Sequence, residues 1–166
     1  MATGPRYKVA FRRRRESRTN YYIRKKLLAS HETRAVIRRS NKNVTVQFVD
    51  FTMTGDVVVA AADTKEFKAM GWEHSCSSVP AAYLVGYAAG LRAKKAEIEY
   101  AVLDLGMQNP QHGGVLFAVA KGMMDAGLEI PCSEDVFPDE DRILGKHIDE
   151  AIEAAVNSMK EKLEAE

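Results

Sequence analysis

Residues 34–62 read RAVIRRSNKNVTVQFVDFTMTGDVVVAAA and contain three short runs that favour β-strands. The runs span residues 34–39, 44–49 and 57–62, and turn-forming residues at 40–43 and 54–56 separate them. In the second run, Val44, Val46 and Phe48 fall on one face, because successive side chains of a strand point to opposite sides. Two short turns between three strands predict an antiparallel meander.

The segments after this meander alternate between helix and strand patterns. Ser78, followed by Pro80, marks the start of a helix that we expect to continue to about Ala96. Its Gly86, Ala89, Gly90 and Ala93 are small, which would allow close approach to a sheet. A fourth strand is predicted at 99–105, a loop at 106–114, and a helix at 115–126 that Gly127 ends. The order β-β-β-α-β-α predicts an α/β fold, with a mixed sheet and helices packed on it.

The two ends of the chain differ from this central region. Residues 1–18 form a basic arm, for which we expect no packed structure without a partner, because adjacent arginines repel one another. A helix begins near Thr19 or Asn20, and its Ile23 and Leu27 share a face that could pack on the core. An acidic, proline-containing connector and a helix at about 147–163 end the chain. We therefore divide it into 1–18, a globular domain at 19–130, and 131–166.

The charge is strongly polarised along the chain. Residues 1–42 hold 14 basic and two acidic residues, a net charge of +12. The remaining 124 residues hold ten basic and 21 acidic residues, a net charge of −11. A positive end of this strength favours a polyanion, of which nucleic acid is the commonest.

The kinds of residue at the positive end favour RNA. Arginine forks, as at Arg12, Arg13, Arg14 and Arg15, match phosphate oxygens and stack on bases. A localisation signal is an alternative, but basic residues continue into the predicted helix and first strand, where such a signal would not need them. The interleaved aromatics are Tyr7, Phe11, Tyr21 and Tyr22. We expect Phe11 to wedge against RNA or a neighbouring protein, whereas the helix tyrosines could equally stack on bases or anchor the helix to the core.

Enzyme chemistry finds little support in the sequence. Asp50 and Asp104 lie on predicted strands and could in principle meet, as in ribonuclease-H-like nucleases, but they form no recognisable cluster. Cys76 and Cys132 are best explained as small buried side chains in a reducing, cytoplasmic setting, and the sequence predicts no metal or other cofactor. Neither a secretion signal nor a membrane-spanning stretch is expected. A chromatin-like protein that binds duplex DNA remains a further alternative.

Motifs along nearly the whole chain, to about residue 150, resemble one family, ribosomal protein eighteen of the large subunit in its archaeal form. Its eukaryotic counterpart is ribosomal protein five. The matching segments are residues 4–9, 12–16, 19–21, 27–28, 40–42, 71–72, 82–84, 101–104, 125–128 and 145–148.

The resemblance implies a non-enzymatic protein that binds 5S rRNA and helps attach it to the central protuberance of the large subunit. It also implies contacts with 23S rRNA and with neighbouring large-subunit proteins, and no membrane or small-molecule substrate. The residues expected to face RNA are Arg6, Tyr7, Lys8, Phe11, Arg12, Arg13, Arg14, Arg15, Arg18, Arg24, Lys25, Lys26, Arg34, Arg38, Asn41 and Lys42.

Overall fold

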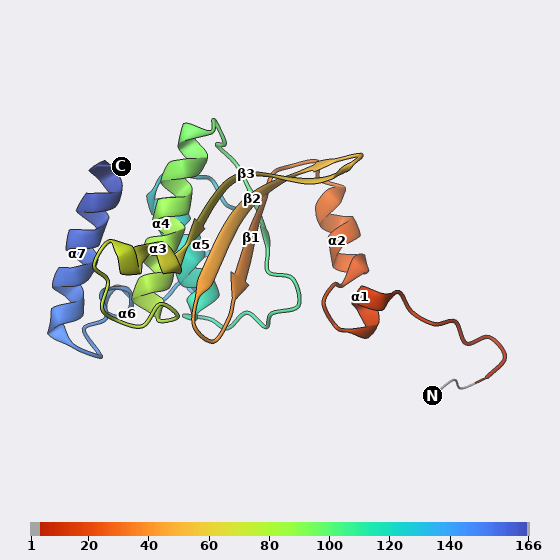
Figure 1. Cartoon of the computed structure of the whole chain (residues 1–166), viewed down its shortest axis with the longest axis horizontal. Helices are drawn as coiled ribbons and strands as arrows, with labels where there is room; N and C mark the ends of the chain where they lie inside the picture. The colour runs from red at the N-terminus through yellow and green to blue at the C-terminus, as the bar shows by residue number, and fades with distance from the viewer. Residues whose placement is uncertain (1–3, 166) are drawn as a thin grey trace.

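A computed structural model describes residues 4–165 and contains a mixed four-stranded sheet at its centre (Figure 1). The strands are β1 (Arg34–Arg39), β2 (Val44–Thr52), β3 (Gly55–Asp63) and β4 (Val102–Asp104), in the spatial order β3-β2-β1-β4. The first three form the predicted antiparallel meander, and β4 pairs with β1 in parallel. The predicted α/β class and mixed sheet are therefore confirmed.

The fourth strand is shorter than expected because its first residues pair elsewhere. Tyr100 forms a bridge with Glu129, and the Ala101 amide donates to the Glu129 carbonyl at 3.1 Å. Only residues 102–104 remain to pair with β1.

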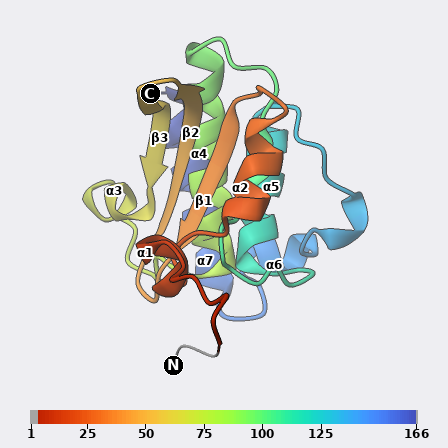
Figure 2. The ribbon, with the colours of Figure 1, turned by 90° about the vertical axis from the view of Figure 1, so that its right-hand side faces the viewer.

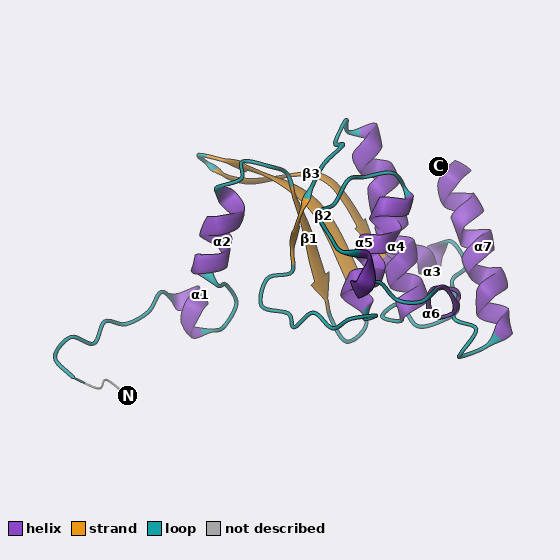
Figure 3. Cartoon of the chain, turned by 180° about the vertical axis from the view of Figure 1, so that it is seen from behind, coloured by secondary structure: helices purple, strands orange, loops and turns teal. Residues whose placement is uncertain are grey.

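One face of the sheet carries the core and the large helices. Val44, Val46 and Phe48 are fully buried on this face, as their alternation predicts. The main helices here are α4 (Val79–Lys95), α5 (Val115–Asp125) and α7 (Glu150–Ala165), and α7 packs on the outer side of α4 (Figure 3). Ser78 takes the N-cap position of α4, but its hydroxyl donates back to the Ser75 carbonyl and does not cap the helix.

The two glycines of α4 serve a different contact from the one we expected. A Cβ atom on Gly86 would lie 2.1 Å from the Val119 carbonyl oxygen, and one on Gly90 would lie 2.6 Å from the Ala126 side chain. Both neighbours belong to α5 or its C-terminal end. The glycines therefore let α4 approach α5, and the expectation that they approach the sheet is wrong.

Several short elements were not predicted. Helix α3 (Thr64–Ala69) begins with a capping box. The Asp63 side chain accepts from the Lys65 amide, and the Glu66 side chain accepts from the Asp63 amide. The connector contains a 3-10 turn, η1 (Glu134–Val136), and a short helix, α6 (Glu140–Leu144). Helix α7 begins at residue 150 and not at 147, because residues 145–148 form a turn after left-handed Gly145.

Among residues 4–165, the helices on the opposite face of the sheet are the N-terminal ones (Figure 2). The arginine run forms one exposed helical turn, α1 (Arg12–Arg15), and α2 (Tyr21–Leu28) follows, with the Asn20 side chain accepting from the Tyr22 and Ile23 amides. No residue of either helix is buried. The expected packing of Ile23 and Leu27 on the core is therefore wrong, because the sheet face beneath them presents polar and charged side chains.

Candidate nucleic-acid interface

Most of the side chains that we expected to face RNA lie on the molecular surface. All of them in the arm, from Arg6 to Arg18, are exposed, and so are Lys25, Lys26, Asn41 and Lys42. Helices α1 and α2, which carry Arg12–Arg15, Lys25 and Lys26, lie on the side of the sheet away from α4 and α7 (Figures 1 and 2). Asn41 and Lys42 lie in the turn between β1 and β2. Arg12 is representative, with 78% of its side chain exposed.

Four arginines from different elements converge on one small cleft. Arg13, Arg18, Arg24 and Arg38 line it, and its volume is about 110 Å³. The Arg13 Nε atom donates to the Thr19 hydroxyl at 2.9 Å, which holds α1 against the start of α2. The fold thus brings the arm, α2 and β1 together at a single positively charged surface.

An arginine–carboxylate network fastens α2 to the sheet beneath this cleft. Arg24 donates to both Asp56 oxygens at 2.9 and 2.8 Å, which joins α2 to β3. Arg34 lies between two carboxylates, 2.9 Å from Asp56 Oδ2 and 3.0 Å from Asp104 Oδ2. Arg38 is the last member of this network, and its guanidinium lies 3.2 Å from Asp104 Oδ1. We call these five residues the arginine–carboxylate bridge.

The buried position of Arg34 corrects one member of the predicted RNA-facing set. Its side chain is only 2% exposed, and its two carboxylate partners come from β3 and β4. Contact with RNA would require both ion pairs to break. Arg38 lies on the same strand face but is 48% exposed, so part of its side chain stays open to solvent while Asp104 holds its guanidinium group. Arg34 is therefore a structural residue that supports the basic surface from below.

The electrostatics of Asp56 agree with this supporting role. Burial raises the pKa of its carboxyl group, but hydrogen bonds and charge from Arg24 and Arg34 outweigh burial, and the pKa lies below its ordinary value of 3.8. Asp56 therefore stays ionised at neutral pH and continues to hold both arginines.

The aromatic side chains of the arm and α2 are not buried. Phe11 is 76% exposed and contacts Tyr21 edge-to-face, with 5.8 Å between ring centroids. Tyr22 is 70% exposed, and the Lys26 ammonium lies 4.6 Å from its ring centroid. The alternative in which Tyr21 or Tyr22 anchors α2 to the core is therefore wrong, and these rings are open to bases or neighbouring chains.

A second cleft lies at the turn between β1 and β2. Its volume is about 340 Å³, and Arg39, Asn41 and Gln108 are among its lining residues. Gln108 Oε1 accepts from the Arg39 amide at 2.9 Å, which joins the 106–114 loop to this turn. Sequence reasoning omitted Arg39 and Gln108 from the interface. The basic side chain of Arg39 close to Asn41 could have indicated the first of these residues. Nothing in the sequence pointed to Gln108.

The two aspartates considered for nuclease chemistry do not come together. Asp104 is held by Arg34 and Arg38, and Asp50 accepts from the Thr33 hydroxyl at 2.6 Å on a different strand. Among residues 4–165, no three His, Cys, Asp or Glu side chains form a group that could hold a metal ion.

In the same range no helix is both long and apolar enough to cross a bilayer. Cys76 is buried, and Cys132 is only partly buried.

Comparison with known proteins identifies the family. The model of a family described as ribosomal large subunit proteins 60S L5 and 50S L18 matches residues 5–98. Large ribosomal subunit protein uL18 of Ignicoccus hospitalis is 51% identical over 95% of this chain and 77% of its own length. The Korarchaeum cryptofilum protein of the same name is 49% identical over 89% of this chain and 76% of its own. The protein of this name from Haloarcula marismortui is 49% identical over 90% of this chain and 80% of its own length. This chain belongs to the uL18 family of large ribosomal subunit proteins.

Proposed function

We propose that this chain binds 5S rRNA through its basic N-terminal surface and helps attach that RNA to the central protuberance of the large subunit. It also contacts 23S rRNA and neighbouring large-subunit proteins. The observation that carries the proposal is the concentration of exposed cations in the N-terminal elements. Residues 1–42 hold 14 of the 24 lysines and arginines, and 12 of these 14 are exposed. Such a surface suits a phosphate backbone.

The identity of the RNA comes from the family resemblance, and the contact residues come from exposure, except for Arg24, which is partly buried and lines the cleft of four arginines. The proposed RNA-binding set is the predicted one without Arg34 and with Arg39 added, that is Arg6, Tyr7, Lys8, Phe11, Arg12, Arg13, Arg14, Arg15, Arg18, Arg24, Lys25, Lys26, Arg38, Arg39, Asn41 and Lys42. The protein works in the cytoplasm as part of the large subunit. Its family is one of structural ribosomal proteins and not of enzymes.

The arm and the folded surface have separate roles in this proposal. The arm supplies phosphate contacts that are independent of RNA sequence, so it contributes affinity and salt dependence. Lys25, Arg38 and their neighbours are held by α2 and β1, and side chains at fixed positions can match an RNA shape. Preference for 5S rRNA over other RNA should therefore depend on the folded surface.

Binding isotherms at several salt concentrations test the proposal, with unrelated structured RNA and duplex DNA as competitors. Six to ten phosphate contacts would lower affinity by roughly a thousand-fold between low and moderately raised salt. Deletion of residues 1–15 removes six positive charges, so the salt dependence should become shallower while the preference for 5S rRNA remains. Charge reversal at Lys25, which is exposed and lies outside the arginine–carboxylate bridge, should reduce the preference itself. Equal affinity for duplex DNA would contradict the proposal.

A further inference from the structure

The hairpin of β2 and β3 exposes a cluster of apolar side chains near its tip. Five large apolar residues within nine positions are each more than two-fifths exposed, and Met53 is completely exposed. They are Phe51, Met53, Val57, Val58 and Val59. Figure 1 shows the hairpin extending beyond the helical layer that covers the rest of the sheet. We call residues 51–60 the hairpin surface. Several exposed apolar side chains on one hairpin favour a site of interaction.

The charge of this region does not suit RNA. Residues 43–64 contain no lysine or arginine, although the chain has 24, and they contain three aspartates. Asp56 is held by Arg24 and Arg34, and Asp50 accepts from Thr33, so these carboxylates serve the fold. The hairpin surface therefore offers apolar side chains and no cation. A phosphate backbone would find no cation to pair with there, whereas an apolar protein segment would bury apolar surface, which favours binding.

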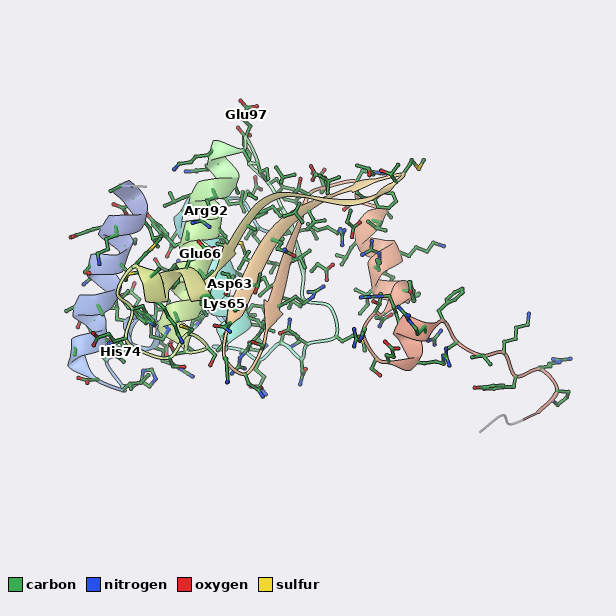
Figure 4. All side chains as sticks on the ribbon, in the orientation of Figure 1. Asp63, Lys65, Glu66, His74, Arg92 and Glu97 are labelled. Atoms are coloured by element: carbon green, nitrogen blue, oxygen red, sulfur yellow. The ribbon has the colours of Figure 1, made fainter. Side chains whose placement is uncertain are left out.

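Strand β3 is also an edge strand of the sheet. Its end nearest α3 is covered, because Arg92 Nη1 donates to the Ala61 carbonyl at 2.9 Å and its Nη2 lies 2.7 Å from Glu66. Figure 4 shows Arg92, Glu66 and Asp63 gathered at this end. The β2–β3 register shifts at Phe48/Val49, which leaves Val59 without a partner in the ladder, so the regular part of the edge is residues 55–58. This part contains neither lysine nor proline, which commonly prevent pairing at sheet edges. Its two valines favour strand pairing there.

From these observations we infer that the hairpin surface binds an extended, apolar segment of a neighbouring large-subunit protein, which adds as a strand beside β3. Backbone hydrogen bonds along the edge would give affinity, and alternate apolar side chains would meet the valines. Crosslinking within the assembled subunit distinguishes this occupant from a second copy of the chain. The inference rests on the proposed place in the large subunit but not on 5S rRNA binding.

Photo-crosslinking within the assembled subunit tests the identity of the occupant. Benzoylphenylalanine replaces Val57 in one variant and Ile148, which is 58% exposed elsewhere, in a control variant. In purified large subunits, the Val57 position should crosslink to one protein segment with apolar residues at alternate positions, and the control should not reach that segment. Crosslinks to rRNA, to a second copy or to a helical segment would overturn the inference, and so would the absence of a crosslink.

A charge substitution separates this inference from the RNA-binding proposal. Val57→Lys should leave 5S rRNA affinity in solution unchanged and lower retention in salt-washed large subunits by about ten-fold, as loss of one central contact does. If the hairpin surface faced RNA, the added cation would instead tighten binding. Ile148→Lys controls for the added charge, and a thermal melt confirms folding. Unchanged retention of Val57→Lys would overturn the inference alone, whereas weak 5S rRNA binding by the unsubstituted chain would overturn the proposed function alone.

Discussion

Asp104→Asn removes one charge from the arginine–carboxylate bridge and leaves the shape of the side chain almost unchanged. Arg34, which is 2% exposed, would then keep only Asp56 as a counter-ion at 2.9 Å. Removal of one partner from a buried ion pair destabilises a protein by about 3–5 kcal/mol, because the other charge is left uncompensated. Since Asp56 remains, we expect a loss near the lower limit, about 3 kcal/mol.

Urea unfolding of the free protein, followed by circular dichroism, measures this loss. With a slope of about 2 kcal/mol per molar urea, the midpoint should fall by roughly 1.5 M while the slope stays constant. Glu161→Gln, an exposed substitution on α7, controls for charge removal and should change stability by less than about 0.5 kcal/mol.

A double-mutant cycle identifies the source of the effect. In an Arg34→Met background no buried guanidinium remains, so Asp104→Asn should destabilise by less than about 1 kcal/mol. Equal losses in the two backgrounds, or a loss below about 1 kcal/mol in the unsubstituted chain, would refute the reasoning about the bridge.

Three further predictions concern other parts of the fold. Tyr87→Phe removes a 2.7 Å hydrogen bond to Glu164 and should lower the free energy of unfolding by about 1 kcal/mol in urea titrations. The lowered pKa of Asp56 gives stability that is present above pH 3.8 and is lost as pH falls through the folded value, so Asp56→Asn should flatten the dependence of Tm on pH in that acid range. Gly86→Ala would place a Cβ atom 2.1 Å from the Val119 carbonyl oxygen and should cost about 3 kcal/mol, with faster amide exchange in α4 and α5.

Local patterns were enough to predict the elements that form the core. Alternation alone placed Val44, Val46 and Phe48 inside, and all three are fully buried. A proline in the first turn correctly marked the start of α4. The capping box of α3 was equally visible, since Asp63 and Glu66 have its spacing, but no strong apolar period accompanies these six residues.

The role of Arg34 could not be read from the sequence, because it depends on partners far along the chain. Its carboxylates are 22 and 70 residues away, and only the pairing of β3, β2, β1 and β4 brings them to the same face. Arg34 and Arg38 are four residues apart in β1, so the period of a strand places them on one face. This period could not show that one side chain would be enclosed and the other exposed, since that difference comes from the arrangement of neighbouring elements.

This difference affects how mutations of the basic surface should be interpreted. Charge reversal at Arg34 would act first on the folded protein and not on its contact with RNA. It would place a third carboxylate between Asp56 and Asp104, which lie 2.9 and 3.0 Å from the present guanidinium. Helix α2 would no longer be held on the sheet, and Arg24 would lose its fixed position. Weak RNA binding by such a variant would therefore not identify Arg34 as a contact residue. Only substitutions that leave the bridge intact, such as Lys25→Glu on the exposed side of α2, can separate recognition of RNA from folding of the surface that recognises it.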